Sequence, residues 1–137
     1  MATAAQKLQY IEGIGRRKTA SARVRMTKAS ATTIVVNGKE HKEYFKHAAL
    51  QQAFQSVLDT KDIGIENYTI TVKVVGGGLS SQAGAVRLGI ARALLAEKSD
   101  RRIPLKKEGY LKRDPRSVER KKFGLRKARK RPAWSKR

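Results

Sequence analysis

The chain has 137 residues, no cysteine and a formal net charge of +21 at pH 7. Without cysteine, neither disulfide bridges nor cysteine-based zinc sites can form, and no run approaches the roughly 18 apolar residues of a membrane span. We therefore expect a protein of an aqueous, reducing compartment that has one modest folded domain and an anionic partner.

The charge is concentrated at the carboxyl end of the chain. Residues 101–137 hold 17 Lys or Arg against three acids, a net charge of +14, whereas residues 1–100 carry +7. A segment with so few counter-charges cannot bury itself, and nucleic acid is the densest anionic polymer that it could bind. We therefore predict a nucleic-acid-binding protein with a folded body over residues 1–100 and an extended basic tail over residues 101–137.

The first part of the body has the patterns of β-strands. Residues 10–15 are predicted to form a strand that enters a glycine-rich bend. The next strand alternates apolar with polar or charged residues, which places one set of side chains in the core: Ala20, Ala22, Val24 and Met26. Residues 32–36 are a third, β-branched run, and the Asn37-Gly38 pair that follows it is a strong signal for a tight turn.

The second part of the body alternates between helix and strand. A helix is predicted over residues 44–58, with one apolar face made by Phe45, Ala48, Ala49, Phe54 and Leu58. Residues 68–74 alternate as a further strand. Ser80-Ser81 is predicted to cap a helix over residues 82–98, in which Gly84 and Gly89 favour close packing on the sheet. Its apolar stripe is Val86, Ile90, Ala93 and Leu94.

These elements give the order β-β-β-α-β-α, an α+β fold with helices against one face of a mixed or antiparallel sheet. Beyond residue 100, five prolines and glycines interrupt any long helix and large apolar residues become sparse. A short helix around residues 118–122 is compatible with the sequence. The rest of the tail is expected to become ordered only on what it binds.

Four blocks of sequence occur in one order along the chain. The first spans residues 13–24 and is followed by Val36-Asn37-Gly38 and Tyr44-Phe45; the others span residues 75–85, residues 88–94, and residues 114–124 with the terminal Ser-Lys-Arg. Together they resemble the S-nine family, the universal ninth protein of the small ribosomal subunit.

The resemblance implies a body packed on ribosomal RNA in the head of the small subunit, beside other ribosomal proteins. It implies a tail that threads through RNA until its tip, Ser135, Lys136 and Arg137, lies near the transfer RNA in the peptidyl site. It also implies a left-handed β-α-β crossover. A bacterial cytoplasm fits best as the location, with the plastid stroma as the alternative.

Arginine and lysine at strand spacing, beside glycines that allow close backbone approach, are suited to bind RNA phosphates. The alternative is a solvated sheet edge whose charges deter aggregation. The residues we predict to bind RNA are Arg16, Arg17, Lys18, Arg23, Arg25, Lys73, Arg113, Arg116, Arg120, Lys121, Lys122, Arg126, Lys127, Arg129, Lys130 and Arg131. Phe123 and Trp134 lie between cationic runs and could stack on unpaired bases or against a protein neighbour.

No pattern indicates catalysis, a metal site or a cofactor. His41 and His47 have the wrong spacing to bind metal together from one helical face and are expected at the surface. The glycines at 76–78 are predicted to form a structural turn, although their loop faintly resembles that of small-molecule kinases. Two other classes stay open: a protein that compacts DNA or acts as a general RNA chaperone, and a kinase relic that binds ATP.

Overall fold

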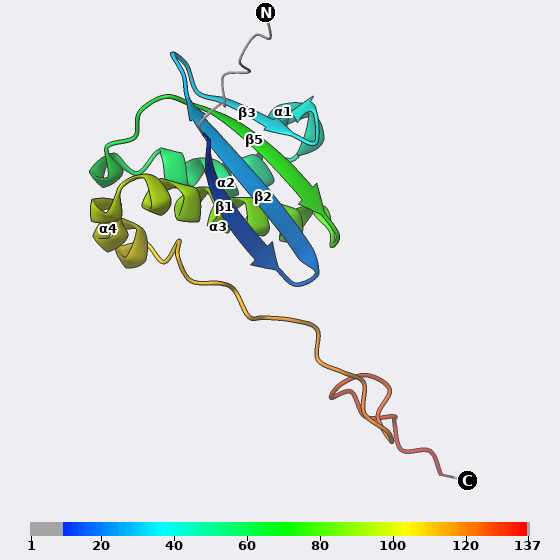
Figure 1. Ribbon diagram of the computed structural model, residues 1–137. Coiled ribbons are helices and arrows are strands. Elements are labelled where there is room, and N and C mark those ends of the chain that lie inside the picture. Colours follow the sequence, from blue (N-terminus) through cyan, green and yellow to red (C-terminus); the bar gives the residue numbers. More distant parts are fainter. Residues whose placement is uncertain (1–9, 137) are drawn as a thin grey trace, which may run out of the picture.

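Alternating apolar side chains build a five-stranded sheet in the computed structural model, which describes residues 10–136 (Figure 1). The strands follow the order β1-β2-β5-β3-β4, and only β3 and β5 are parallel neighbours. Their bounds are β1 Ile11–Arg17, β2 Ala20–Lys28, β3 Thr33–Val36, β4 Lys39–Glu40 and β5 Tyr68–Val75. The predicted α+β fold with a mixed sheet is confirmed; the hand of the crossover between β3 and β5 stays a prediction.

The four apolar residues predicted to face the core from β2 are all buried. The Asn37-Gly38 turn is also confirmed: both residues have positive φ, 49° and 81°, and the turn joins β3 to β4. Asn37 holds this corner to β5, because its Nδ2 donates to the carbonyl oxygen of Val74 at 3.0 Å and its Oδ1 accepts from the Val74 amide at 2.9 Å.

Helices cover one face of the sheet and leave the other face open (Figure 1). Their bounds are α1 His41–Tyr44, α2 Ala48–Leu58, α3 Leu79–Glu97 and α4 Arg102–Lys107, with single 3-10 turns at Lys61–Ile63 and Ser99–Arg101. Of the predicted stripe on α3, Val86, Ile90, Ala93 and Leu94 are all buried. The helices therefore form one layer, on the apolar side that the strand pattern predicts.

The single helix predicted over residues 44–58 is wrong. The chain leaves helical geometry at Phe45, whose ring is buried against Phe54 at a centroid distance of 5.6 Å and whose carbonyl oxygen accepts from Gln51 Nε2 at 2.6 Å. Ala48 and Ala49 are exposed rather than buried, and Val57 takes a core position instead. Burying Phe45 outweighs helix continuity, because a large aromatic gains more from burial than one turn gains from propensity.

The start of α3 also differs from the prediction. Gly78 is its N-cap and Leu79 its first residue, so Ser80-Ser81 lies inside the first turn and caps nothing. Gly76 and Gly77 both have positive φ and turn the chain tightly against the β1–β2 hairpin. A Cβ on Gly76 would lie 2.6 Å from the carbonyl oxygen of Thr19. The glycine triplet thus forms a structural turn, as predicted, and Gly76 and Gly77 are its closely packed residues.

Glycines let α3 approach β1 backbone to backbone. A Cβ on Gly15 would lie 1.8 Å from the carbonyl oxygen of Ala85, and one on Gly13 would lie 2.2 Å from that of Gly89. A Cβ on Gly89 would in turn meet the Val24 side chain at 2.6 Å. The close packing predicted for Gly89 is confirmed, and β1 supplies the matching glycines.

The chain stays packed against the body as far as Leu111. Leu105 on α4 is fully buried, and Arg101 is buried where its Nε and Nη2 donate to the carbonyl oxygens of Ile63 and Gly64, each at 3.0 Å. Pro104 is tolerated because it lies in the first turn of α4, where its missing N–H is not needed.

Residues 112–136, here called the extended tail, form no helix or strand, including residues 118–122. They run away from the body in Figure 1. Within residues 10–136 no helix is both long and apolar enough to cross a membrane.

Candidate nucleic-acid interface

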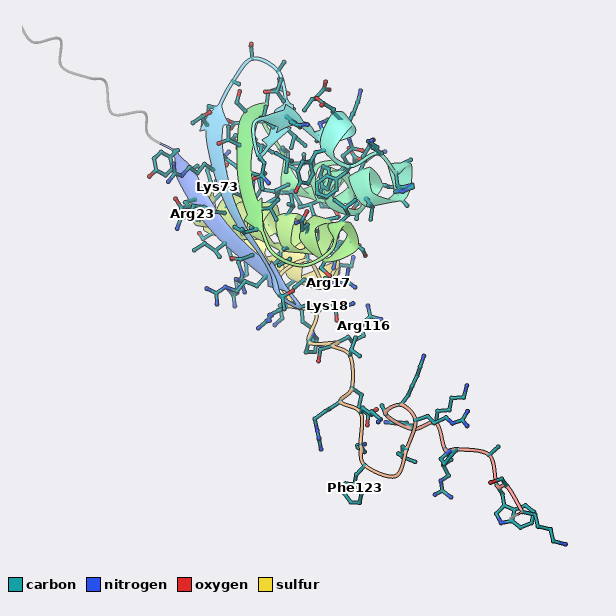
Figure 2. The ribbon with its side chains drawn as sticks, turned by 90° about the vertical axis from the view of Figure 1, so that its right-hand side faces the viewer. Arg17, Lys18, Arg23, Lys73, Arg116 and Phe123 are labelled. Carbon is teal, nitrogen blue, oxygen red and sulfur yellow. The ribbon has the colours of Figure 1, made fainter. Side chains whose placement is uncertain are left out.

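The uncovered side of β2 and β5 forms a basic surface, here called the open sheet face. Its exposed residues include Arg23 and Arg25 on β2, and Thr71 and Lys73 on β5. They line a shallow hollow of about 680 Å³ together with the Asn37-Gly38 turn. Figure 2 shows Arg23 and Lys73 on neighbouring strands. Strand alternation therefore brings together three of the predicted RNA-binding residues.

One acid supports two of these cations. The Glu12 carboxylate forms an ion pair with Arg23, whose Nε lies 3.3 Å away, and accepts a hydrogen bond from Arg25 Nε at 3.2 Å. The Arg25 guanidinium also lies 4.6 Å from the centre of the Tyr10 ring. Lys73 makes no ion pair within residues 10–136. Two guanidinium groups with one carboxylate still leave a net positive surface.

The three basic residues at the end of the β1–β2 hairpin do not share one surface. Arg16 and Lys18 are exposed, and Lys18 takes a positive φ of 50° in the turn. Arg17 is half-buried and follows Gly13 and Gly15 on the side of β1 that faces α3. The sequence grouped Arg16, Arg17 and Lys18, whereas strand alternation separates Arg17 from the other two.

The extended tail presents its cations to solvent. Every predicted RNA-binding residue from Arg113 to Arg131 is exposed, as are Ser135 and Lys136; Arg137 lies outside the described residues. Glu119 pairs with Lys122 at 2.6 Å and with Arg129 at 2.9 Å, and the hydrogen bonds from these two residues lower the pKa of its carboxyl. The hydrogen bonds of Arg116 lower the pKa of the Asp114 carboxyl. Both acids are therefore charged at neutral pH and neutralise only a small part of the tail.

Phe123 and Trp134 are the two most exposed large aromatics of the described chain, at 98% and 85%. Phe123 projects from the extended tail in Figure 2, away from the body. Exposed aromatic rings between cations match the pattern by which proteins stack on unpaired bases.

The structure brings together a further set of cations that the sequence analysis missed. A hollow of about 530 Å³ with Leu95 and Leu111 in its lining is surrounded by Arg92, Arg102, Lys106 and Lys112. Arg102 and Lys106 are four residues apart on α4 and thus share a helical face. This spacing could have revealed them, but the sequence pattern predicted no helix over residues 102–107.

The two histidines differ in burial. His41 is buried, contrary to the prediction, because its Nδ1 lies 3.3 Å from the carbonyl oxygen of Ile34 and its Nε2 lies 3.2 Å from Gln55. His47 is exposed, as predicted. No group of three metal-binding side chains exists within residues 10–136.

Comparison with known proteins shows which family this chain resembles. A family model described as ribosomal protein S9/S16 matches residues 15–137. The chain is 53% identical over 127 residues to the small ribosomal subunit protein uS9 of Gloeothece citriformis, an alignment that covers 91% of this chain and 90% of the relative. It is 52% identical to the protein of the same name from Gloeobacter violaceus, with 91% and 93% covered, and 51% identical to that of a Synechocystis strain, with 91% and 90% covered.

Proposed function

We propose, from the premise that this chain belongs to the ribosomal protein S9 family, that it binds small-subunit ribosomal RNA through two basic regions and that its tail reaches the transfer RNA in the peptidyl site. Membership in this family makes the chain a structural, non-enzymatic component of the small ribosomal subunit. The kinase alternative is therefore wrong. The RNA contacts and the place of the tail tip are our proposal.

The open sheet face supports the first part of the proposal. Arg23, Arg25 and Lys73 are exposed on adjacent strands over a shallow hollow, and no other part of residues 10–136 covers them. A rigid basic surface of this kind suits the backbone of folded RNA, where phosphate positions and groove shape are recognised rather than base sequence.

The extended tail gives the strongest support for RNA binding. Between residues 112 and 136 no residue is buried, yet almost half of the positions are Lys or Arg. Such a segment has no core of its own and gains order by neutralising phosphates. Its tip would hold the transfer RNA backbone electrostatically, without recognising the identity of the transfer RNA.

The cyanobacterial relatives are consistent with ribosomes of a bacterial cytoplasm or of a plastid. A DNA-compacting protein or general RNA chaperone would share the basic tail. No feature of the described residues favours that alternative over the ribosomal one.

The first test is the distribution of a tagged chain on a sucrose gradient, before and after a high-salt wash. We expect one copy per small subunit that survives the wash. The triple variant Arg23→Gln, Arg25→Gln and Lys73→Gln should reduce this retention, whereas Lys42→Gln, Lys46→Gln and Lys61→Gln remove the same charge from exposed positions outside the open sheet face and should not. Spreading over all nucleic acid and loss on washing would overturn the proposal.

The second test is removal of residues 135–137. Because the tip would contact only the transfer RNA backbone, we expect a modest loss of peptidyl-site binding that is equal for different transfer RNAs, with unchanged retention in the subunit. Normal binding in washed subunits that contain the truncated chain would contradict the role of the tip.

A further inference from the structure

The extended tail leaves the body beside a half-buried arginine. Arg17 Nη2 lies 3.2 Å from Asp114 Oδ2, and Arg17 Nη1 donates to the carbonyl oxygen of Ser80 at 3.3 Å. The two charged side chains are only 25% and 18% exposed. One guanidinium therefore connects three segments: the end of β1, the first turn of α3 and the start of the extended tail.

A glycine makes room for this arrangement. A Cβ on Gly84 would lie 2.5 Å from Arg17 Cδ and 3.1 Å from Arg17 Nη1. The Arg17 side chain thus lies directly against the backbone of α3, where a larger residue would push it away. Close packing was predicted for Gly84 against the sheet, but the group that it accommodates is a charged side chain.

Asp114 also fixes the direction of the chain that follows it. Its Oδ1 accepts from the Arg116 amide at 3.1 Å, and its carboxylate accepts from Arg116 Nε and Nη2 at 3.0 Å and 2.9 Å. Pro115 between them restricts the backbone further. Figure 2 shows Arg17, Lys18 and Arg116 at the place where the tail begins.

Electrostatics explains why an acid is needed at this position. The body and the tail are both positive, so the first residues of the extended tail would be repelled by the hairpin. Of the three acids after residue 100, Asp114 is the one that forms an ion pair with a body residue. A single ion pair of this exposure contributes little to global stability. We expect the Arg17–Asp114 pair to affect the direction of the extended tail instead.

We propose that Arg17, Gly84 and Asp114 form a clasp that fixes the direction in which the tail leaves the body. In this role Arg17 and Asp114 are positioning residues that act on the tail, and Arg17 does not serve as a phosphate ligand. The clasp narrows the region that the tail tip samples before and during assembly of the subunit. Its importance for transfer RNA binding rests on the proposed function of the tail.

The geometry can be tested on the free protein, because the chain has no cysteine that would compete for labels. Spin labels on Gln52→Cys and Ser117→Cys report the distance from α2 to the start of the extended tail. We expect one narrow distance distribution, a clearly broader one in Asp114→Asn, and recovery of the narrow one in Asp114→Glu. Glu108→Gln is the matched control: it changes the charge equally, but Glu108 forms no ion pair within residues 10–136.

Two results would overturn the clasp. The distribution of distances between the labels at positions 52 and 117 could stay unchanged in Asp114→Asn, or it could broaden equally in Glu108→Gln. A second pair of labels within the body, on Gln52→Cys and Ser99→Cys, detects any variant that merely unfolds. A change in this second distance would show that the variant disturbs the body rather than the direction of the tail.

Transfer RNA binding by subunits assembled with the same variants tests the clasp and the proposed function of the tail independently. We expect Asp114→Asn to weaken peptidyl-site transfer RNA binding about two- to fivefold, the scale of one surface pair, and Glu108→Gln to leave it unchanged. If removal of residues 135–137 has no effect but Asp114→Asn broadens the distance, the proposed function fails and the clasp stands. If the truncation weakens binding but the distance is unchanged, the clasp fails alone.

Discussion

The body and the extended tail use the same residue types for opposite purposes. In the body, glycines allow backbone contact, acids satisfy a buried arginine and aromatics fill the core. In residues 112–136, the glycine lies in open space, Glu119 lies among solvent-exposed cations and both large aromatics are exposed. The body is stabilised by burial within the chain, whereas we expect the tail to become ordered only on a partner.

The largest contrast is expected between two phenylalanines. Phe54 is fully buried beside Phe45 and His41, so Phe54→Ala should lower the free energy of unfolding by about 3–5 kcal/mol. Phe123→Ala should change it by less than about 0.5 kcal/mol and instead weaken RNA binding by about 1–3 kcal/mol.

Urea denaturation followed by circular dichroism measures the stability of both variants, and a salt-controlled binding assay measures RNA affinity. If Phe54→Ala does not fold, the smaller truncation Phe54→Leu provides a measurable loss. A loss of stability in Phe123→Ala would show that the tail packs on the body in solution and would remove the contrast.

The second contrast concerns glycine. Gly15→Ala would place a methyl group 1.8 Å from the Ala85 carbonyl oxygen, which belongs to a helix backbone and cannot rotate away. We expect a loss of about 3 kcal/mol, at the upper end of the range for overpacking. A Cβ on Gly124 would meet no atom within 4 Å, so the only cost of Gly124→Ala is the φ of 73°, which disfavours alanine by about 1–2 kcal/mol. The unpacked tail can relax this backbone, so we expect a smaller loss of stability than in Gly15→Ala. Equal stability of the two variants would contradict the close packing of β1 on α3.

The third contrast concerns acids. Tyr68 and Arg101 both donate to the Glu97 carboxylate, and Arg101 is itself buried. Burial raises the pKa of Glu97, but the hydrogen bonds from Tyr68 and Arg101 outweigh it, so the pKa lies below its usual 4.5. Glu97→Gln should therefore cost about 2 kcal/mol near neutral pH, because it leaves the charge of Arg101 poorly compensated. Glu119→Gln, in the exposed tail, should cost less than about 0.5 kcal/mol.

The lowered pKa of Glu97 also predicts how the stability difference between the parent chain and Glu97→Gln changes with pH. A carboxyl whose pKa is lower in the folded state stabilises the fold above its unfolded pKa, and this contribution is lost as the pH falls through the folded pKa. The stability difference between the parent chain and Glu97→Gln should thus shrink below pH 4.5. A difference that stays constant or grows on acidification would show that the Glu97 carboxylate does not stabilise the fold.

Local sequence patterns predicted the strands more accurately than the helices. Alternation identified the core face of β2, and Asn37-Gly38 marked the turn before β4, because both signals depend on neighbouring residues alone. The break at Phe45 depends on Phe54, nine residues further on, so the helical spacing could not reveal it. The same holds for His41, whose burial is set by Ile34 and Gln55.

The sequence by itself determined that the chain has a folded part and a strongly basic tail, because charge and apolar periodicity are local quantities. It also determined the family, through four blocks in one order. The tertiary structure alone decided which cations share a surface: it placed Arg23 beside Lys73 through β2–β5 pairing, turned Arg17 toward α3 and joined it to Asp114. These contacts span up to 97 positions of the chain, and such distant pairs form only when the sheet and α3 pack together.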